Sequence, residues 1–277
     1  MSLVITGLGF ALPGNGTTLL GPADDNSDPV DPAARLGRKG LRYKDRATQL
    51  GLCAASDALK SAGLWDDGLT VTDRSVAVVV SSNLGNVDTV CKVAQTIGEE
   101  GSRGVSPMDT PNASSNILAS EVAIRFGLRG PNLMVCNGAT SGLDAVHWAS
   151  TMLRAGRADH VLVLGVEPDN EIVRQLVDAE RVLDGAVGFV LERPGRENAT
   201  VRATIGKVVR AAEVEPQGRV FNLEDRWGTC SGALGVMQCA AAVEWFEQGG
   251  EGPVMALVGS HFDDAMAGVL VYAGEPA

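Results

Sequence analysis

The sequence predicts an α/β protein in which short buried strands alternate with amphipathic helices. Hydrophobic residues make up 45% of the 277 residues, so the chain can bury a sizeable core. The 34 glycines and 12 prolines are spread along the chain, which suits the many tight turns of such a fold. Strands that alternate with helices favour mostly parallel sheets that are covered by helices on both faces.

The expected elements of the first 192 residues can be given in chain order. A buried strand "LVIT" is expected over 3–6, and a loop rich in Gly, Asp and Pro over 13–33. A helix is expected over 45–63, because its apolar residues share one face and Gly63 stands near its end. The later elements are expected, in order, as a strand at 76–80, helices at 86–98 and 112–127, a strand at 133–136, a helix at 141–155 and strands at 160–166 and 186–192.

The order of elements repeats within the chain. Residues 141–192 run as helix, glycine turn, strand, acidic loop and strand, and residues 231–273 repeat that order in a shorter form. The second copy has far fewer residues ahead of its helix, and this loss is internal to the chain. We therefore expect two related halves, an N-terminal half over 1–195 and a shortened C-terminal half over 196–277.

Composition argues against several classes of function. The formal net charge of −11 disfavours nucleic acid as a partner, since the phosphate backbone would be repelled. The apolar runs fall short of the ~20 residues that a membrane helix needs, so no membrane partner is expected. The N-terminus has no basic leader, so no signal peptide is expected either. Five cysteines without metal-like spacing indicate reduced thiols in a cytoplasmic protein.

Metal and nucleotide cofactors are not expected. The chain has 3 histidines, which disfavours a multi-histidine metal site. The stretch "GLGFALPGNG" at 7–16 has Leu12 where a dinucleotide-binding fingerprint needs its third glycine.

One stretch has the form of a catalytic elbow. In "LMVCNGATSGLDAVHWA" at 133–149, an apolar strand enters a turn of small residues that opens a helix. Such a turn points a side chain over the end of a sheet. Its centre reads Asn137, Gly138, Ala139, Thr140, Ser141. Ser141 and His147 do not form a hydrolase pair, because residues six apart do not share a helix face.

Four stretches resemble the β-ketoacyl synthases of the thiolase fold, which act in fatty acid and type II polyketide synthesis. They are "VITGLGFALPG", "KDRATQLGLCAASDALKSAGL", "RGPNLMVCNGATSGLDAVHWASTMLRAGRADHVLVLGVE" and "GTCSGALGVMQCAAAVEWFEQG", and they span the chain in the family's order. The resemblance implies a thiolase-like layered fold (αβαβα) with a complete first half and a truncated second half. It also implies a sheet-to-sheet dimer and substrates carried on an acyl carrier protein.

The family's catalytic residues do not carry over. Ala139 falls at the position of the nucleophilic cysteine, and a methyl group cannot form a thioester. Thr229 falls at one of the family's two histidines, and Glu224 at its lysine. The other histidine belongs to a segment that is missing. The resemblance therefore implies a chain that is catalytically silent on its own.

The other thiols and imidazoles are expected to be structural. Cys136 lies in an apolar strand and is expected to be buried. Core faces of helices are expected for Cys53, Cys91 and Cys239. His147 follows the elbow without an assignable partner. Loop or surface positions are expected for His160 and His261.

Two further sets of residues are candidates for contact with partners. In chain-length-factor relatives, the helix that matches 111–128 reaches toward the partner's acyl tunnel. That likeness points to Asn112, Ser115, Asn116 and Ala119. The basic run "RLGRKGLRYKDR" at 35–46 is either a solvated loop or a docking surface for an acidic carrier protein or a partner subunit. Its candidate docking residues are Arg35, Arg38, Lys39, Arg42 and Lys44.

The leading hypothesis is a catalytically silent subunit that pairs with an active ketosynthase and acts as a chain length factor. The pathway would be of the type II polyketide, polyene or fatty-acid-like kind. A homodimer is an alternative. A second hypothesis is an acyltransferase, thioesterase or decarboxylase with relocated groups at Asn137, Thr140, Thr229 or Cys230. A third is a scaffold that binds an acyl carrier protein.

Overall fold

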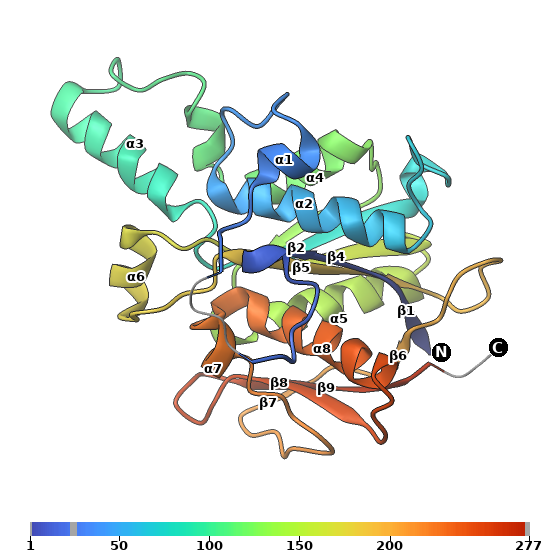
Figure 1. Ribbon diagram of the computed structural model, residues 1–277. Coiled ribbons are helices and arrows are strands. Elements are labelled where there is room, and N and C mark those ends of the chain that lie inside the picture. The colour runs from blue at the N-terminus through green and yellow to red at the C-terminus, as the bar shows by residue number, and fades with distance from the viewer. Residues whose placement is uncertain (1, 23–26, 275–277) are drawn as a thin grey trace.

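The structure is a computed structural model that describes residues 2–22 and 27–274. The described strands form a nine-stranded sheet in the order β3-β2-β4-β5-β1-β6-β9-β7, and β8 pairs with the other side of β9. The sheet is bent, so that its first five strands and its last four form two layers with helices between them (Figure 1).

The first half forms a complete layer with helices on both faces. Its strands, in sheet order, are β3 (Asn132–Val135), β2 (Val76–Ser81), β4 (His160–Glu167), β5 (Gly185–Glu192) and β1 (Leu3–Ala11). The outer face is covered by α1 (Pro32–Leu36), α2 (Arg46–Ser61) and α4 (Ile117–Phe126). The inner face is covered by α5 (Ser141–Arg154) and α8 (Leu234–Glu247). Each face buries its own apolar cluster.

Strand β1 and helix α2 approach each other closely, which explains the glycines of "VITGLGF". A Cβ atom on Gly7 would lie 2.5 Å from the Ala58 carbonyl oxygen, and one on Gly9 would overlap the Ala54 carbonyl oxygen. Small residues on the facing helix allow the same close approach. The glycines of β1 and the small residues of α2 together allow this strand and this helix to pack closely.

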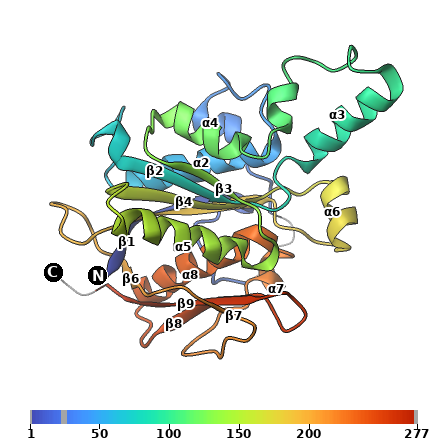
Figure 2. The ribbon, with the colours of Figure 1, turned by 180° about the vertical axis from the view of Figure 1, so that it is seen from behind.

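The second half forms a narrower sheet. Strands β6 (Ala203–Ile205) and β7 (Val209–Ala211) pair with one side of β9 (Met266–Ala273), and β8 (Val254–Val258) pairs with the other. The repeat seen in the sequence is confirmed, because α8, β8 and β9 follow one another as α5, β4 and β5 do. Counterparts of β2, β3, α2 and α4 are missing from the described part of this half. The outermost helical layer of the expected αβαβα order is therefore missing as well (Figure 2).

The expectation of mostly parallel sheets was wrong. Only β2 with β3 and β2 with β4 run parallel among the strand pairs of the described residues. The other six pairs are antiparallel. The reason is that β4 and β5, like β8 and β9, follow each other without a helix that crosses the sheet.

Two helices differ from the sequence prediction. Helix α4 begins at Ile117 instead of residue 112, because the residues before it form the 3-10 turn η3 (Thr110–Ala113). Helix α3 (Val87–Glu100) forms where it was expected, but it projects from the body and buries none of its residues (Figures 1 and 2). Shorter elements are η1 (Pro13–Asn15), η2 (Asp73–Ser75), α6 (Glu171–Val177) and α7 (Glu224–Trp227).

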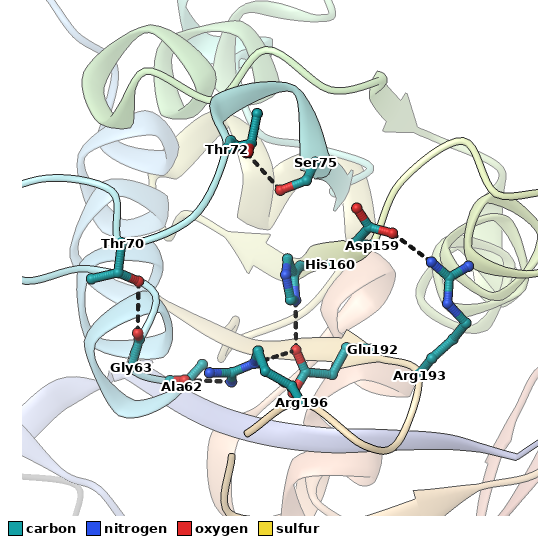
Figure 3. Close-up of polar contacts among 10 residues, drawn as sticks. All are labelled: Ala62, Gly63, Thr70, Thr72, Ser75, Asp159, His160, Glu192, Arg193 and Arg196. Atoms are coloured by element: carbon teal, nitrogen blue, oxygen red, sulfur yellow. Dashed lines mark hydrogen bonds and ion pairs between the residues drawn. The ribbon is translucent and has the colours of Figure 1, made fainter. Parts of the chain in front are cut away.

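A buried ionic cluster closes one end of the first sheet (Figure 3). His160 Nδ1 lies 2.5 Å from Glu192 Oε2, and Arg196 Nε lies 3.0 Å from the same oxygen. Arg196 also donates to the Ala62 carbonyl oxygen beyond α2, over 2.6 Å. Burial alone would raise the pKa of Glu192, but the hydrogen bonds from His160 and Arg196 hold it below its ordinary value.

The expectation of a loop or surface position for His160 was therefore wrong. Strand β4 has neighbours on both edges, and the turn after β5 covers its first residue. His261 lies in the exposed turn after β8, as expected.

Candidate functional site

Two elbows that each open a helix face each other between the two halves, one after strand β3 and the other after the short helix α7. The first is η4 (Gly138–Thr140), which leads into α5, and the second is η5 (Ser231–Ala233), which leads into α8. The two helices begin in backbone contact, because a Cβ atom on Gly142 would lie 2.7 Å from the Gly235 nitrogen. The elbow predicted at 137–141 is thus half of a paired site.

Asn83, in the turn after β2, links the two elbows. Its Nδ2 donates to the Gly138 carbonyl oxygen and to Ser231 Oγ, each over 2.9 Å. Its Oδ1 accepts a hydrogen bond from Ser141 Oγ over 2.8 Å. One side chain therefore fixes the relative position of both helix starts.

Glu167, the last residue of β4, lies buried beneath the same junction. Its carboxylate accepts hydrogen bonds from the backbone nitrogens of Asn83 and Gly232, over 2.8 and 2.9 Å. It also accepts from the Leu84 nitrogen and Ser82 Oγ, each over 3.1 Å. Burial raises the pKa of Glu167 to about 7, although these four hydrogen bonds act in the opposite direction.

Sequence reasoning missed both Asn83 and Glu167. A signal for Glu167 was present, because it is an acidic residue at the end of the otherwise apolar strand "HVLVLGVE". Nothing in the sequence around Asn83 marks it, since its partners lie far away in the chain.

A cavity of about 470 Å³ lies between the elbows. Ala139, Thr229 and Glu224, which come from distant parts of the sequence, all line it. The other lining residues are Asn83, Gly138, Ser231, Leu234, Leu257, Val258, Gly259, Ser260 and Asp263. This set contains no thiol, imidazole or ammonium group, so the described lining offers no strong nucleophile and no cation.

Cys230 is not poised to act as a nucleophile. It is fully buried, and its Sγ donates to the Gly228 carbonyl oxygen over 3.2 Å. Burial raises the pKa of its thiol well above the usual range, so the reactive thiolate is disfavoured. Glu224 accepts a hydrogen bond from the Cys230 backbone nitrogen over 2.8 Å and thereby fixes the start of the second elbow.

Asn137 and Thr140 are engaged within the first elbow. Asn137 Nδ2 and Thr140 Oγ1 both donate to Asp144 Oδ2, each over 2.7 Å. Asp144 lies in the first turn of α5, where a carboxylate is favourable. The contacts of both side chains support the helix start.

The expected burial of Cys136 was wrong. Cys136 is exposed and lines a separate cavity of about 550 Å³ together with His147 and Trp148. Strand β3 is short and has a neighbour on one side only, so the residue after it is left uncovered. Cys91 is exposed too, because α3 projects from the body, whereas Cys53 and Cys239 are buried as expected.

The described residues hold neither a candidate metal site nor a membrane-spanning helix. These residues contain no group of three or more His, Cys, Asp or Glu side chains that could hold a metal ion. Over the same residues, no helix combines the length and apolar character needed to cross a membrane.

Comparison with known proteins agrees with the observed fold. The family model for the β-ketoacyl synthase N-terminal domain matches residues 14–183, which is more than half of the chain. The chain belongs to the β-ketoacyl synthase family. The 3-oxoacyl-[acyl-carrier-protein] synthase 2 of Vibrio cholerae is 32% identical over 135 residues, which are 48% of this chain and 31% of that protein. The matched segment thus spans about a third of that curated relative.

Solved ketosynthase structures share the thiolase-like fold. "The ishigamide ketosynthase/chain length factor" superposes with a TM-score of 0.76 at 20% identity, over 99% of this chain and 100% of that one. A ketosynthase of a type II polyketide system, solved with its acyl-carrier protein, gives 0.79 at 15% identity, over 98% and 99%. At these identities the likeness concerns the fold alone.

The candidate tunnel residues of this ketosynthase-like chain do not share one helix face. Asn112 belongs to η3 and is buried, with its side-chain amide bonded to the Tyr43 carbonyl oxygen. Ala119 lies on α4 but packs into the apolar cluster between the first sheet and its outer helices α2 and α4. Ser115 and Asn116 are exposed just ahead of α4.

The basic run is tied down at its ends and exposed in its middle. Arg35 pairs with Asp57, and Lys44 pairs with Glu121. The exposed residues between them are Arg38, Lys39 and Arg42. A cationic surface of three residues therefore stands on an otherwise acidic chain.

Proposed function

We propose that this chain is a catalytically silent ketosynthase-like subunit that pairs with an active β-ketoacyl synthase and acts as a chain length factor. The observation that carries the proposal is the cavity between the two elbows. It is lined by Ala139, Thr229 and Glu224, where the resemblance implies cysteine, histidine and lysine.

The charge of the cavity supports the same conclusion. Glu224 and Asp263 line it, and no cation does so among the described residues. A carboxylate-bearing extender such as a malonyl thioester would meet like charge there. The chemistry of condensation would therefore belong to the partner.

The edge of the first sheet supports a dimer. Strand β3 pairs with β2 only, and the hydrogen bonds from Val78 to Pro131 and from Ser82 to Val135 show which edge is engaged. By alternation, the backbone groups of Asn132 and Met134 point to the free edge, which is a template for another strand. Trp148 is 48% exposed nearby on α5 and adds apolar surface.

Two smaller surfaces complete the proposal. Arg38, Lys39 and Arg42 would meet the acidic carrier protein, and Ser115 and Asn116 would face the partner's acyl tunnel. The residues at 1–195 and 196–277 are proposed as the two related halves of one subunit.

The test is co-expression with the ketosynthase encoded nearest on the same chromosome, followed by size-exclusion chromatography with light scattering. A one-to-one complex, with condensation only when both chains are present, is the expected result. Met134→Pro should abolish the complex, because it removes a donor from the free edge and leaves the β2 ladder intact. The control variant is Gln175→Ala, on the exposed helix α6. Asp67→Pro does not serve as a control, although it lies in an exposed turn, because proline cannot adopt the positive φ of Asp67.

A stable homodimer that ignores the ketosynthase would contradict the proposal. Replacing Ala139 by cysteine tests whether this chain can catalyse condensation without its partner. Ala139→Cys should give no condensation by this chain alone, because the two histidines are still missing. Turnover by that variant alone would overturn the assignment of catalysis to the partner.

A further inference from the structure

The strands β8 and β9 of the second sheet have apolar residues on their outer face as well as on their inner face. The inward residues of β9, Ala267, Val269 and Val271, pack into the core around α8. The alternate residues Met266, Gly268, Leu270 and Tyr272 therefore face outward. On β8, Met255 and Leu257 share that face, in register with Leu270 and Gly268.

An antiparallel sheet that faces water on one side normally alternates apolar and polar residues. Here the outward residues of β8 and β9 carry no charge at all. Tyr272 is 43% exposed, and Val209 on neighbouring β7 is 53% exposed. In the first half, the equivalent outer face is covered by α2 and α4, so pseudo-symmetry indicates that a helix is missing from the second.

A groove marks the uncovered region. It has a volume of about 270 Å³, and Met255, Leu270, Tyr272 and Val209 form its apolar lining. The segment after β7 borders it, where Val214 packs close to Gly268 and the Gln217 nitrogen lies 3.0 Å from Met255 Sδ. The groove is therefore a shaped surface bounded by the chain's own backbone.

The edge of β8 is closed to an added strand, which favours a helix over a strand as the occupant of this groove. The Met255 nitrogen donates to the Arg219 carbonyl oxygen over 2.7 Å. The Leu257 nitrogen donates to Gln238 Oε1 over 2.9 Å. The backbone nitrogens of Met255 and Leu257, which point away from β9, are thus hydrogen-bonded already. A further strand therefore cannot pair with this edge of β8. A face about three strands or ~14 Å wide accommodates one helix of ~10 Å diameter.

Charge around the groove selects the kind of helix. Glu213 and Glu215 line it, and Lys207 is the one cation among its described lining residues. The nearby Arg219 is turned away, with its guanidinium 4.3 Å from the Trp245 ring centroid. This acidic border complements a basic helix, and it disfavours a second copy of a chain whose net charge is −11.

We propose that the outer face of β8 and β9 binds one amphipathic helix of a partner protein. The apolar stripe of that helix would contact Val209, Leu270 and Tyr272, and its basic flank would face Glu213 and Glu215. This surface is separate from the β3 edge, so the partner could be bound with or without a ketosynthase.

The test uses two fluorescein-labelled helical peptides of about four turns that share one leucine stripe. One carries lysine flanks and the other carries glutamate flanks. The full chain is titrated into each, and binding is followed by fluorescence anisotropy, while hydrogen exchange locates the protected amides. We expect the lysine peptide to bind with protection over residues 254–272, and the glutamate peptide to bind at least tenfold more weakly.

Variants decide whether binding occurs at this face. Leu270→Asp should weaken the lysine peptide at least tenfold, and the pair Glu213→Gln and Glu215→Gln should weaken it about threefold to tenfold. Ile124→Asp, an exposed apolar residue on α4, is the matched control and should leave affinity unchanged. Circular dichroism of each variant checks that it is folded.

Several outcomes would overturn the proposal. They are failure of both peptides to bind, equal binding of the two peptides, or equal effects of the Leu270 and Ile124 variants. Light scattering that shows copies of the chain associating through this face, with loss of association in Leu270→Asp, would assign the groove to self-association instead. Met134→Pro should not change peptide binding, which separates this proposal from the one at the β3 edge.

Discussion

In the first half of the molecule the sheet has helices on both faces, whereas in the second half the sheet has helices on one face only. In the first, β4 is flanked by β2 and β5; in the second, its counterpart β8 has β9 on one side and side-chain and loop contacts on the other. The fold therefore tolerates the loss of an outer helical layer when side-chain and loop contacts bind the backbone groups at the exposed edge of the strand. What is left open is a face, which suits a partner's helix.

The sharpest way to break this comparison is to place a methyl group on one outward-facing glycine in each of the two sheets. In Gly9→Ala, the new Cβ overlaps the backbone of α2 at Ala54, so we expect a loss of about 3 kcal/mol in unfolding free energy. In Gly268→Ala, the Cβ meets the flexible end of Met255, so the loss should be below about 1 kcal/mol. Urea denaturation followed by circular dichroism measures both. Equal losses would mean that the second sheet is as tightly covered as the first.

The stability that Glu167 contributes at the junction between the halves should fall as the pH rises toward neutrality. The folded chain keeps a proton on Glu167, whose pKa is raised to about 7, while the unfolded chain has released it near 4.5. Since the folded state binds more protons in that window, stability should fall by about 2 kcal/mol as pH rises from 5 to 7.5. Glu167→Gln should flatten this dependence in denaturation curves recorded across the range. A wild-type curve that is already flat would contradict it.

The far end of the first half should respond in the opposite direction. His160 and Arg196 hold the pKa of Glu192 below its ordinary value, so its contribution is full above about pH 4.5 and is lost as pH falls through the lowered pKa. At pH 7, Glu192→Gln should cost about 2 kcal/mol, because a charged hydrogen-bond acceptor is removed. Thermal melts at pH 7 and pH 4 check the sign; the difference between variant and wild type should shrink in acid. Glu197→Gln, on the exposed turn nearby, is the control.

The seal on β8 should give the smallest of these effects. Gln238 accepts from the Leu257 nitrogen and donates to the Phe221 carbonyl oxygen over 3.2 Å. Gln238→Leu leaves both backbone groups without that partner, which should cost about 1 kcal/mol and speed hydrogen exchange at Leu257. Gln248→Leu, on the exposed end of α8, provides the comparison. Unchanged exchange at Leu257 would show that the edge is protected in another way.

Much of the candidate site could be predicted from sequence because it depends on local pattern. The apolar strands, the elbow at 137–141 and the repeat of elements between the halves were all recognised in this way. The degenerate positions Ala139, Thr229 and Glu224 were identified from motif order, and the structure brings them around one cavity. The start of α4 was misplaced, because a 3-10 turn and a helix begin with similar residues.

By itself, the sequence determined most of the apolar strands, the elbow at 137–141 and the residues that stand at three positions of the family's motifs, Ala139, Thr229 and Glu224. Only the tertiary structure decided that most strand pairs run antiparallel, that His160 is buried and that Cys136 is exposed. It alone joined Asn83 to both elbows and Glu167 to the second, and it left the outer face of the second sheet without a helix. The physical reason is that local periodicity reports which face of an element is apolar, whereas the partner of that face comes from residues far away in the chain.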